Sequence, residues 1–377
     1  MRARSLSWGA TLVATTLLVT ACGGTAATNA PSAAPSSAAP ASSAPAPSST
    51  DAGASRSPVA VQLPAPEKTK VTIGQSGEWS AGNLHAAIAE YTGLDERFGL
   101  DVTFTPFSGG SQVVQALVAG QVDVSDNSGG PVIASLATDV PLEMTFVTRS
   151  NLTDNLYTAK DVKTADDLKG KSIAISSFGS QSHAGALLAL KKLGLTTDDV
   201  TITQVGNDSA RLAALQGGSV AGSMNDSTRA AELEGLGFNT LVKLAEVEGL
   251  GGVPRTSMTV TKEFAQQNPN LVLALTAMYY EANLMWRENP ELAAEALASL
   301  AKMDPADAKT DVDTVLKEKW EPLDGRCDAA VMDFTKQTLI EANPDVADVD
   351  ASQACTNEFL DKLTELGWTP DTTPPSS

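Results

Sequence analysis

From about residue 70, short runs of β-branched and apolar residues alternate with segments whose apolar residues recur every three to four positions. The first kind of segment predicts strands and the second predicts amphipathic helices. The predicted strands are 70–74, 101–107, 122–125, 142–148, 171–175, 200–205 and 220–224, and the helices between them include 83–91, 113–119 and 187–193. Alternation of this kind favours an α/β fold with mainly parallel sheets flanked by helices.

After Thr261 the pattern becomes helical throughout. Pro269, Pro290 and Pro305 each stand where a long apolar-periodic segment begins, and proline is well tolerated in the first turn of a helix. Further helices are expected around 332–340 and 359–366. We expect these C-terminal helices to pack on the first of two lobes.

Residues 101–127 and 199–225 align without a gap at an offset of 98, with 11 of 27 positions identical. A period this long does not fit a solenoid, but it fits two similar α/β lobes. We assign 67–150 and 252–377 to lobe 1 and 151–251 to lobe 2, with crossings near 149–155 and 251–257. Ligands of open α/β sheets bind at the carboxyl ends of the strands, so two facing lobes indicate a binding cleft.

The N-terminal segment has the features of a secretory signal. Arg2 and Arg4 precede an apolar stretch, and small residues follow it, so 1–21 is predicted to be a signal peptide that is too short to span a membrane. Its end resembles a bacterial lipobox, which makes Cys22 the lipidated first residue, although an ordinary signal peptide with a chance cysteine remains open. Residues 22–66 are mostly Ala, Ser, Pro and Thr, a composition typical of a disordered tether.

Charge and cysteine content exclude some functions. The net charge of −19 argues against nucleic-acid binding, which favours basic surfaces. Outside the cytoplasm, Cys327 and Cys355 are most simply a disulfide worth about 3 kcal/mol, although two free thiols are the alternative. With no third cysteine near this pair, a metal site is not expected.

Several segments in this order match a known family. They are Lys70–Gly74, the run from Gln115 to Asp123, Asp166–Lys171 before a strand, and the helices marked by Asn268-Pro269, Trp286 and Asn289-Pro290. Together they resemble the lipid-anchored substrate-binding proteins of ABC importers for nitrate, sulfonates, taurine and thiamine-pyrimidine precursors. The resemblance implies a two-lobed, type II periplasmic-binding-protein fold that closes over one small molecule. It also implies a membrane permease and a separate ATPase as partners, a monomer, and a place on the outer face of the cell membrane.

The loops after the strands supply the candidate ligand-binding residues. Hydroxyls, amides, carboxylates and two aromatic rings gather there, and glycines precede helix starts that can present free N–H groups to an anion. Core packing, helix capping and turn formation explain the same residue types without a ligand. The candidates are Glu78, Trp79, Ser80, Ser108, Gly109, Gly110, Ser111, Asp126, Asn127, Ser128, Phe178, Ser180, Gln181, Ser182, Asn225 and Asp226. Arg149, Arg211, Arg229 and Arg255 are weaker candidates for an anion clamp.

The chain carries no nucleophile elbow, P-loop, H-E-x-x-H or Cys/His cluster, so neither an enzyme nor a cofactor is expected. A secreted hydrolase that uses Glu78 and Asp126 is a remote alternative. A surface sensor with the same binding fold is the other alternative to an importer protein. If Glu78, Asp126 and Asp226 all face the cleft, they disfavour a bare inorganic anion. A zwitterion of the taurine type or a nitrogen heterocycle is then the better ligand.

Overall fold

The structure of the protein is a computed structural model that describes residues 62–150, 153–247, 253–318, 322–340 and 343–375. The predicted signal peptide, Cys22 and nearly all of the predicted tether lie outside these residues. So do parts of both predicted crossings, at 151–152 and 251–252.

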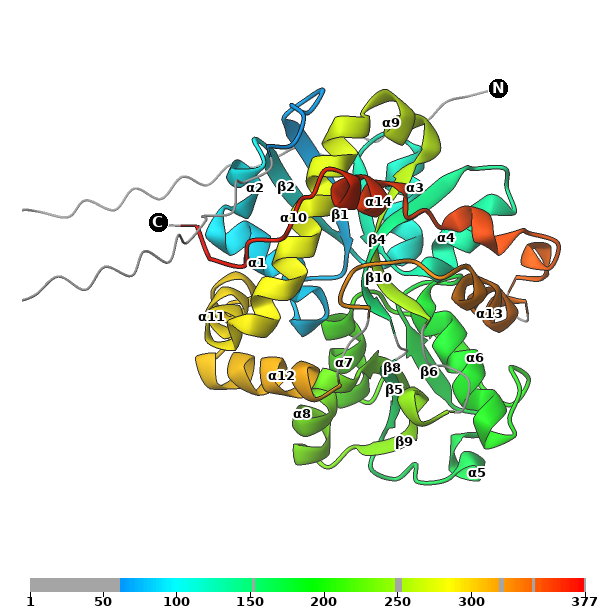
Figure 1. Ribbon diagram of the computed structural model, residues 1–377. Helices are drawn as coiled ribbons and strands as arrows, with labels where there is room; N and C mark the ends of the chain where they lie inside the picture. Colours follow the sequence, from blue (N-terminus) through cyan, green and yellow to red (C-terminus); the bar gives the residue numbers. More distant parts are fainter. Residues whose placement is uncertain (1–61, 151–152, 248–252, 319–321, 341–342, 376–377) are drawn as a thin grey trace, which may run out of the picture. The chain divides into compact units, whose positions relative to one another are not determined.

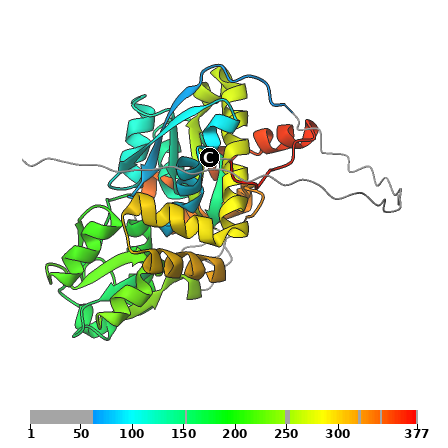
Figure 2. The same cartoon turned by 90° about the vertical axis from the view of Figure 1, so that its left-hand side faces the viewer.

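Two five-stranded sheets form the framework (Figures 1 and 2). The first sheet has the order β2-β1-β3-β10-β4, and the second has the order β7-β6-β8-β5-β9. The strands of the first are β1 Lys70–Ser76, β2 Asp101–Phe107, β3 Val124–Asn127, β4 Leu142–Ser150 and β10 Pro254–Thr261. Those of the second are β5 Asp154–Thr158, β6 Ser172–Ile175, β7 Thr201–Gln204, β8 Gly222–Asp226 and β9 Asn239–Lys243.

Each sheet contains one strand that runs against the others. β1 pairs in parallel with β2 and β3, whereas β10 pairs antiparallel with both β3 and β4. In the second sheet β6 pairs in parallel with β7 and β8, and β5 pairs antiparallel with β8 and β9. The sheets are therefore mixed, and the reversed strand of each is the one that the chain enters when it crosses from the other sheet.

Helices cover both sheets (Figure 1). Between β1 and β10 they are α1 Leu84–Thr92, α2 Leu94–Arg97, α3 Gly110–Val118, α4 Gly129–Leu136, α5 Ala165–Leu168, α6 Gln181–Leu193, α7 Asp208–Gln216 and α8 Ala230–Gly235, with 3-10 turns η1 Ala81–Asn83, η2 Ser227–Arg229 and η3 Leu244–Glu246. After β10 they are α9 Lys262–Gln267, α10 Pro269–Glu288, α11 Pro290–Ala301, α12 Pro305–Glu318, α13 Ala329–Leu339 and α14 Glu358–Glu365, with η4 Pro344–Val346 and η5 Ala351–Ala354. No helix of the described segments is both long enough and apolar enough to cross a membrane.

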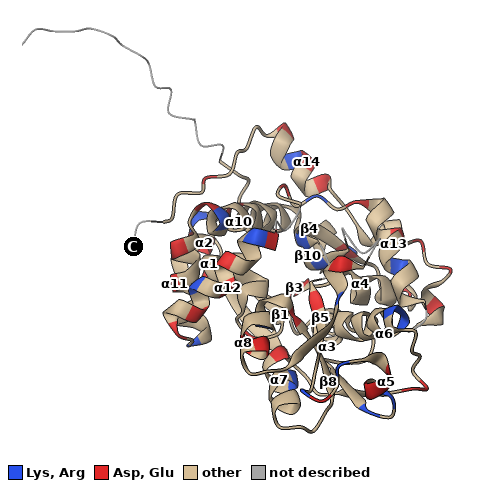
Figure 3. Ribbon diagram, turned by 90° about the horizontal axis from the view of Figure 1, so that it is seen from below, with Lys and Arg blue, Asp and Glu red and all other residues tan. Residues whose placement is uncertain are grey.

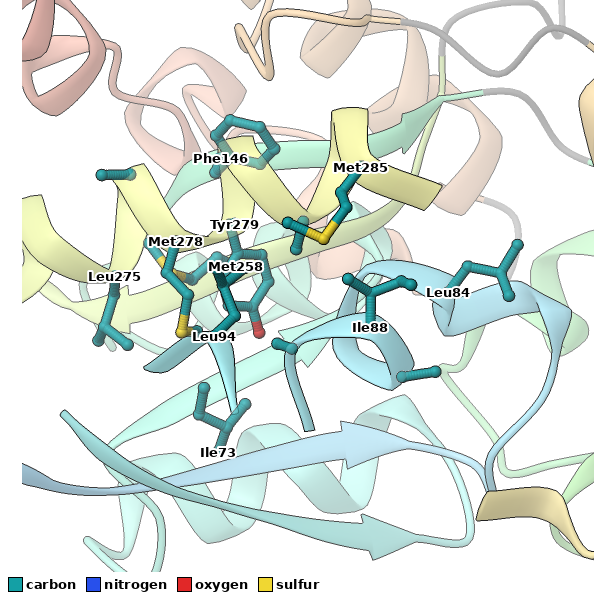
Figure 4. Packing of buried hydrophobic residues seen from close by; sticks show 14 of the residues in the cluster. Ile73, Leu84, Ile88, Leu94, Phe146, Met258, Leu275, Met278, Tyr279 and Met285 are labelled. Carbon is teal, nitrogen blue, oxygen red and sulfur yellow. The ribbon is translucent and has the colours of Figure 1, made fainter. Parts of the chain in front are cut away.

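The largest apolar core lies between the first sheet and the helix α10. Leu275, Met278 and Tyr279 of α10 are fully or almost fully buried against α1 and the strands β1 and β10 (Figure 4). Burying such side chains stabilises a fold by roughly 1.5–3 kcal/mol each, so α10 anchors the first lobe. Helix α10 also contacts α14 and β4.

The C-terminal helices do not all stay on the first lobe. Helix α12 contacts η1 beside the first sheet and η2 beside the second, and α13 contacts both α4 and α6. The expectation that these helices pack on lobe 1 therefore holds for α10 and α14, whereas α12 and α13 touch both lobes.

The internal repeat corresponds to equivalent structural elements. Helices α3 and α7 have nine residues each, and their bounds differ by the 98 residues of the sequence offset. At the strand that follows, Asn127 donates from Nδ2 to the Gly110 carbonyl at 3.2 Å, and Asn225 donates from Nδ2 to the Asp208 carbonyl at 2.9 Å. The two asparagines therefore make the same scaffold bond in both lobes, tying the end of a strand to the first residue of a helix.

Candidate ligand-binding site

A polar cavity of about 100 Å³ lies where the carboxyl ends of strands from both sheets face each other. Its walls come from the loops after β1, β2 and β3 on one side and after β6, β7 and β8 on the other, together with the starts of β5 and β10. Contacts between the lobes close its rim. Ser111 Oγ donates to the Phe178 carbonyl at 3.2 Å, and Asn207 Nδ2 donates to Glu78 Oε1 at 3.3 Å.

Most residues that the sequence singled out lie around this cavity. Thirteen of the sixteen line it: Glu78, Trp79, Ser80, Ser108, Gly109, Gly110, Asp126, Asn127, Ser128, Ser180, Gln181, Ser182 and Asp226. Trp79 also packs edge-on against Phe104, with ring centroids 5.7 Å apart, so its ring serves the core as well as the cavity wall.

Three candidates lie elsewhere. Ser111 is turned to the rim, where its hydroxyl is used in the contact with Phe178. The ring of Phe178 is 55% exposed and packs edge-on against His183. Asn225 is buried, and the scaffold bond to Asp208 takes up its amide. None of the three lines the cavity, and their assignment as ligand-binding residues stays a prediction.

The cavity is also lined by residues outside these sixteen, and three of them are weaker arginine candidates from the sequence. The additional lining residues are Gln75, Ser76, Gly77, Gly82, Asn83, Asp154, Ser176, Asn207, Asp208, Ser209, Arg211, Thr228, Arg229, Arg255 and Thr256. Gln75 directly follows a predicted strand, so its position could have been found from the sequence. Asp154 and Arg255 belong to the reversed strands, whose ends reach the cavity only because the sheets are mixed.

The helix starts of the two lobes differ. In lobe 1 the residues before α3 and α4, Gly109 and Ser128, make no side-chain capping bond. In lobe 2 Ser180 caps α6 by accepting from the His183 amide, and Asn207 caps α7 by accepting from the Ala210 amide. Because uncapped N–H groups and the helix dipole attract anions, lobe 1 offers the better anion cradle.

The arginines of the cavity are already paired with aspartates. Arg211 and Arg229 bind opposite oxygens of Asp208, at 3.0 Å and 3.1 Å. Arg255 lies 3.2 Å from Asp154 and 3.6 Å from Asp226. The lining contains five carboxylates and three guanidinium groups, so the arginines do not make the cavity positive.

A chain of alternating charges joins the lobes where the polypeptide crosses between them. Arg149 of β4 lies 3.0 Å from Asp226 of β8, which also faces Arg255 of β10, and Arg255 reaches Asp154 of β5. Figure 3 shows basic positions on β4 and β10 close to acidic positions near β5. Burial acts to raise the pKa of Asp226, but Arg149 and Arg255 outweigh it and lower this pKa to about 2. Burial also lowers the pKa of Arg149.

The lobe 1 side of the cavity contains a buried acid–imidazole pair. His85 Nε2 and Asp126 Oδ2 are 2.7 Å apart, and both side chains are almost fully buried. Tyr279 packs against the His85 ring, with centroids 5.1 Å apart. Burial, with a smaller contribution from the charge of Asp126, raises the pKa of Tyr279 well above its usual value.

The opposite wall carries a triangle of serine hydroxyls. Ser176, Ser180 and Ser182 have their Oγ atoms 2.9–3.0 Å from one another. His183, next to this triangle, accepts a hydrogen bond at Nδ1 from the Gly179 amide, and burial lowers its pKa. The three hydroxyls therefore hydrogen-bond to one another, which orders the loop in front of α6.

Among the described residues, no group of three His, Cys, Asp or Glu side chains is arranged to hold a metal ion.

Two mixed sheets, each flanked by helices and facing the other across a polar cavity, define the class of periplasmic binding proteins. The chain belongs to the NMT1-like family, whose model matches residues 64–301. The resemblance inferred from the ordered sequence segments is thereby confirmed.

Other proteins are similar to this chain in sequence or in structure. The taurine-binding periplasmic protein of Escherichia coli strain K12 is 28% identical over 305 residues, covering 77% of this chain and 93% of that protein. A protein of Bordetella bronchiseptica RB50 superposes with a TM-score of 0.71 at 26% identity, covering 80% of this chain and 98% of its own. The alkanesulfonate-binding protein of Xanthomonas axonopodis pv. citri was solved with MOPS bound. It superposes with a TM-score of 0.63 at 22% identity, covering 76% of this chain and 98% of its own. The two relatives named by function are binding proteins of small sulfonates.

Proposed function

We propose that this protein is the extracytoplasmic solute-binding component of an ABC importer. It captures one small organic molecule, a zwitterion of the sulfonate or taurine type or a nitrogen heterocycle, and delivers it to a membrane permease driven by a separate ATPase. The observation that carries the proposal is the polar cavity between the lobes, with the uncapped starts of α3 and α4 in its wall. The thirteen candidates that line the cavity would contact the ligand.

The size and charge of the cavity support a small zwitterion. One water needs roughly 10–15 Å³ of such space, so a cavity of about 100 Å³ suits a molecule of several heavy atoms. The helix starts favour an anionic group, whereas the excess of carboxylates disfavours a ligand that is only an anion. A molecule with one negative and one positive charge can place the first at the helix starts and the second at the carboxylates.

The relatives support transport as the role. The taurine-binding periplasmic protein of Escherichia coli is similar to this chain over most of its length. We further propose that lipid on Cys22 holds the protein, as a monomer, on the outer face of the cell membrane. The segment from Gly23 to Pro66 would then act as the tether.

A thermal-unfolding panel on the full chain in detergent tests the proposal. Taurine and other small zwitterionic sulfonates, and aminopyrimidines as heterocycles, should raise the unfolding temperature, whereas nitrate and sulfate should not. Ligand at about 100 times its Kd adds about 2.7 kcal/mol to the free energy of unfolding. Stabilisation by nitrate or sulfate alone would contradict the zwitterion or heterocycle assignment. The importer role itself would lose its support if no small solute stabilised the protein.

A further inference from the structure

Three buried oxygen atoms of cavity-lining side chains accept no hydrogen bond from the part of the protein that the structure describes. They are Gln75 Oε1, Asp126 Oδ1 and Gln181 Oε1. Their residues are 1%, 2% and 9% exposed. Buried acceptors without a donor are uncommon in proteins, and each needs a physical explanation.

The orientation of both glutamine amides is set by their nitrogens. Gln75 Nε2 donates to the Gly77 carbonyl at 3.3 Å, and Gln181 Nε2 donates to Asp154 Oδ2 at 3.1 Å. Both partners are oxygens, which accept and cannot donate here. A flipped amide would place two acceptors together, so the free atom of each glutamine is its oxygen.

Gln75 and Asp126 lie side by side. They are register partners on the adjacent parallel strands β1 and β3, and register partners in a sheet project from the same face. The second oxygen of Asp126 is held by His85 at 2.7 Å, which fixes the direction of the carboxylate. Lobe 1 therefore presents a rigid pair of acceptors, one of them on a carboxylate.

Gln181 supplies the third acceptor from lobe 2. It is the first residue of α6, and its bond to Asp154 links it to the charge chain between the lobes. A group that reaches all three oxygens therefore contacts both lobes at once.

We propose that Gln75, Asp126 and Gln181 form a subsite for a nitrogen of the solute that carries several N–H groups and a positive charge, as in a primary ammonium or an amidinium. This inference rests on the proposed function. It adds that one end of the solute is recognised through its N–H donors. Three acceptors need several donors, which a hydroxyl does not provide and a quaternary ammonium lacks. The acidic member favours a cation, because hydrogen bonds between charged partners are the stronger ones. The solute then places its anionic end at the starts of α3 and α4.

Calorimetric titration of the full chain in detergent compares ligands that share one anionic group. Taurine carries the ammonium, isethionate replaces it with a hydroxyl, ethanesulfonate removes it, and N,N,N-trimethyltaurine keeps the charge without any N–H. Taurine should bind at least about tenfold more tightly than each of the other three, because the loss of a charged hydrogen bond costs about that factor or more. β-Alanine and propionate repeat the comparison with a carboxylate.

The variant Asp126→Asn should reduce the preference for taurine over ethanesulfonate to within about threefold. Gln181→Leu, in the other lobe, should lower the same preference by about tenfold, the effect of losing one hydrogen bond to a charged group. The matched control is Asp123→Asn, three residues from Asp126, because Asp123 pairs with Lys68 outside the cavity lining. This control should keep the wild-type preference. Each preference is a ratio measured on one protein, so partial unfolding of a variant does not change it.

Three results overturn the inference in distinguishable ways. If ethanesulfonate or trimethyltaurine binds the wild type as tightly as taurine, the N–H subsite is wrong while solute binding stands. If none of the sulfonates or carboxylates binds, the sulfonate or taurine type of ligand in the proposed function is wrong and the inference fails with it. An unchanged preference in both Asp126→Asn and Gln181→Leu also overturns it, because the discrimination then lies at other residues.

Discussion

Gly110, the first residue of α3, has no room for a side chain. A Cβ atom built on it would lie 2.3 Å from Asn127 Oδ1, while the Asn127 amide nitrogen donates to the Gly110 carbonyl. The neighbouring Gly109 would meet Ser176 Oγ of the opposite lobe at 3.0 Å. These two glycines let the start of α3 approach both the end of β3 and the facing lobe.

Gly110→Ala should therefore lower the free energy of unfolding by roughly 1–3 kcal/mol, because Asn127 is displaced from its bond. It should also weaken ligand binding, since Asn127 lines the cavity. Urea unfolding and calorimetric titration measure the two effects. Gly235→Ala in α8 is the control, because a Cβ at that position has nothing within 4 Å. If Gly110→Ala and Gly235→Ala have equal effects, the close approach of Asn127 does not explain why position 110 is a glycine.

Asp226 stabilises the protein through its charge. Its folded pKa of about 2 lies below the ordinary value of 3.8, so its contribution is present above about pH 4 and is lost as the pH falls towards 2. Asp226→Asn removes the carboxylate charge that Arg149 and Arg255 share. It should lower the free energy of unfolding at pH 7 by about 3 kcal/mol.

Urea unfolding between pH 7 and pH 2 checks this expectation. The difference between wild type and Asp226→Asn should shrink below about pH 4. Asp161→Asn breaks only an exposed pair with Lys171 and should change stability by less than about 1 kcal/mol at every pH. A difference that stays constant with pH would contradict the ionic role of Asp226.

Among the elements, α12 connects the lobes, contacting η1 on one side and η2 on the other. Ser227 of η2 donates from Oγ to Glu318 Oε1 at 2.5 Å, at the end of α12. Burial raises the pKa of Asp311 in the same helix to about 6, although Arg229 opposes the shift. Since the folded pKa lies above the unfolded value, folding takes up a proton and stability falls as the pH rises from about 4 to 6.

Asp311→Asn should therefore stabilise the protein at pH 7, by about 1 kcal/mol once solvent screening of this half-buried group is considered. At pH 4 the gain should disappear, because the native carboxyl is then protonated. Thermal unfolding at the two pH values measures it. Asp313→Asn, which removes an exposed pair with Lys309 on the same helix, should cost a few tenths of a kcal/mol at pH 7. Destabilisation by Asp311→Asn at pH 7 would refute the expected sign.

The segment from α13 to η5 is held at both ends. Cys327 and Cys355 lie 28 positions apart in sequence, and their Cα atoms are 5.8 Å apart, within the range that a disulfide bridges. We expect a disulfide in the protein, detected as the loss of two hydrogens in the intact mass. Cys327→Ser with Cys355→Ser should then lower the free energy of unfolding by about 3 kcal/mol. A wild type that loses no stability on reduction would contradict a structural bond.

The elements show how far the sequence determines the fold. β2 was predicted with its observed bounds, because its apolar and polar residues alternate. β3 lies at 124–127 and not at the predicted 122–125, since its buried end is polar: Ser125, Asp126 and Asn127 are each at most 2% exposed. The repeat made Asn127 and Asn225 look equivalent, and they are equivalent as scaffold. Only Asn127 lines the cavity, because Asp208 stands where lobe 1 has Gly110.

At the scale of the whole molecule, the proposed lipid anchor makes membrane attachment depend on Cys22. Cys22→Ser should move the protein from the membrane fraction to the soluble fraction, because stable anchoring needs its acyl chains. Fractionation and the mass of the mature N-terminus measure the change. Cys355→Ser is the control and should remain in the membrane fraction. Membrane attachment of Cys22→Ser would show that another feature holds the protein there.

For the proposed capture of a solute, the unequal helix starts of the two lobes predict an order of events. Open N–H groups at α3 and α4 should attract the solute to lobe 1 before the lobes meet, while lobe 2, with α6 and α7 already capped, should mainly cover it. Changes in lobe 1 should therefore alter the association rate constant, and changes in lobe 2 the dissociation rate constant. A nearly symmetric fold thus gives an asymmetric path of capture, in which one lobe sets how fast the solute arrives and the other how long it stays.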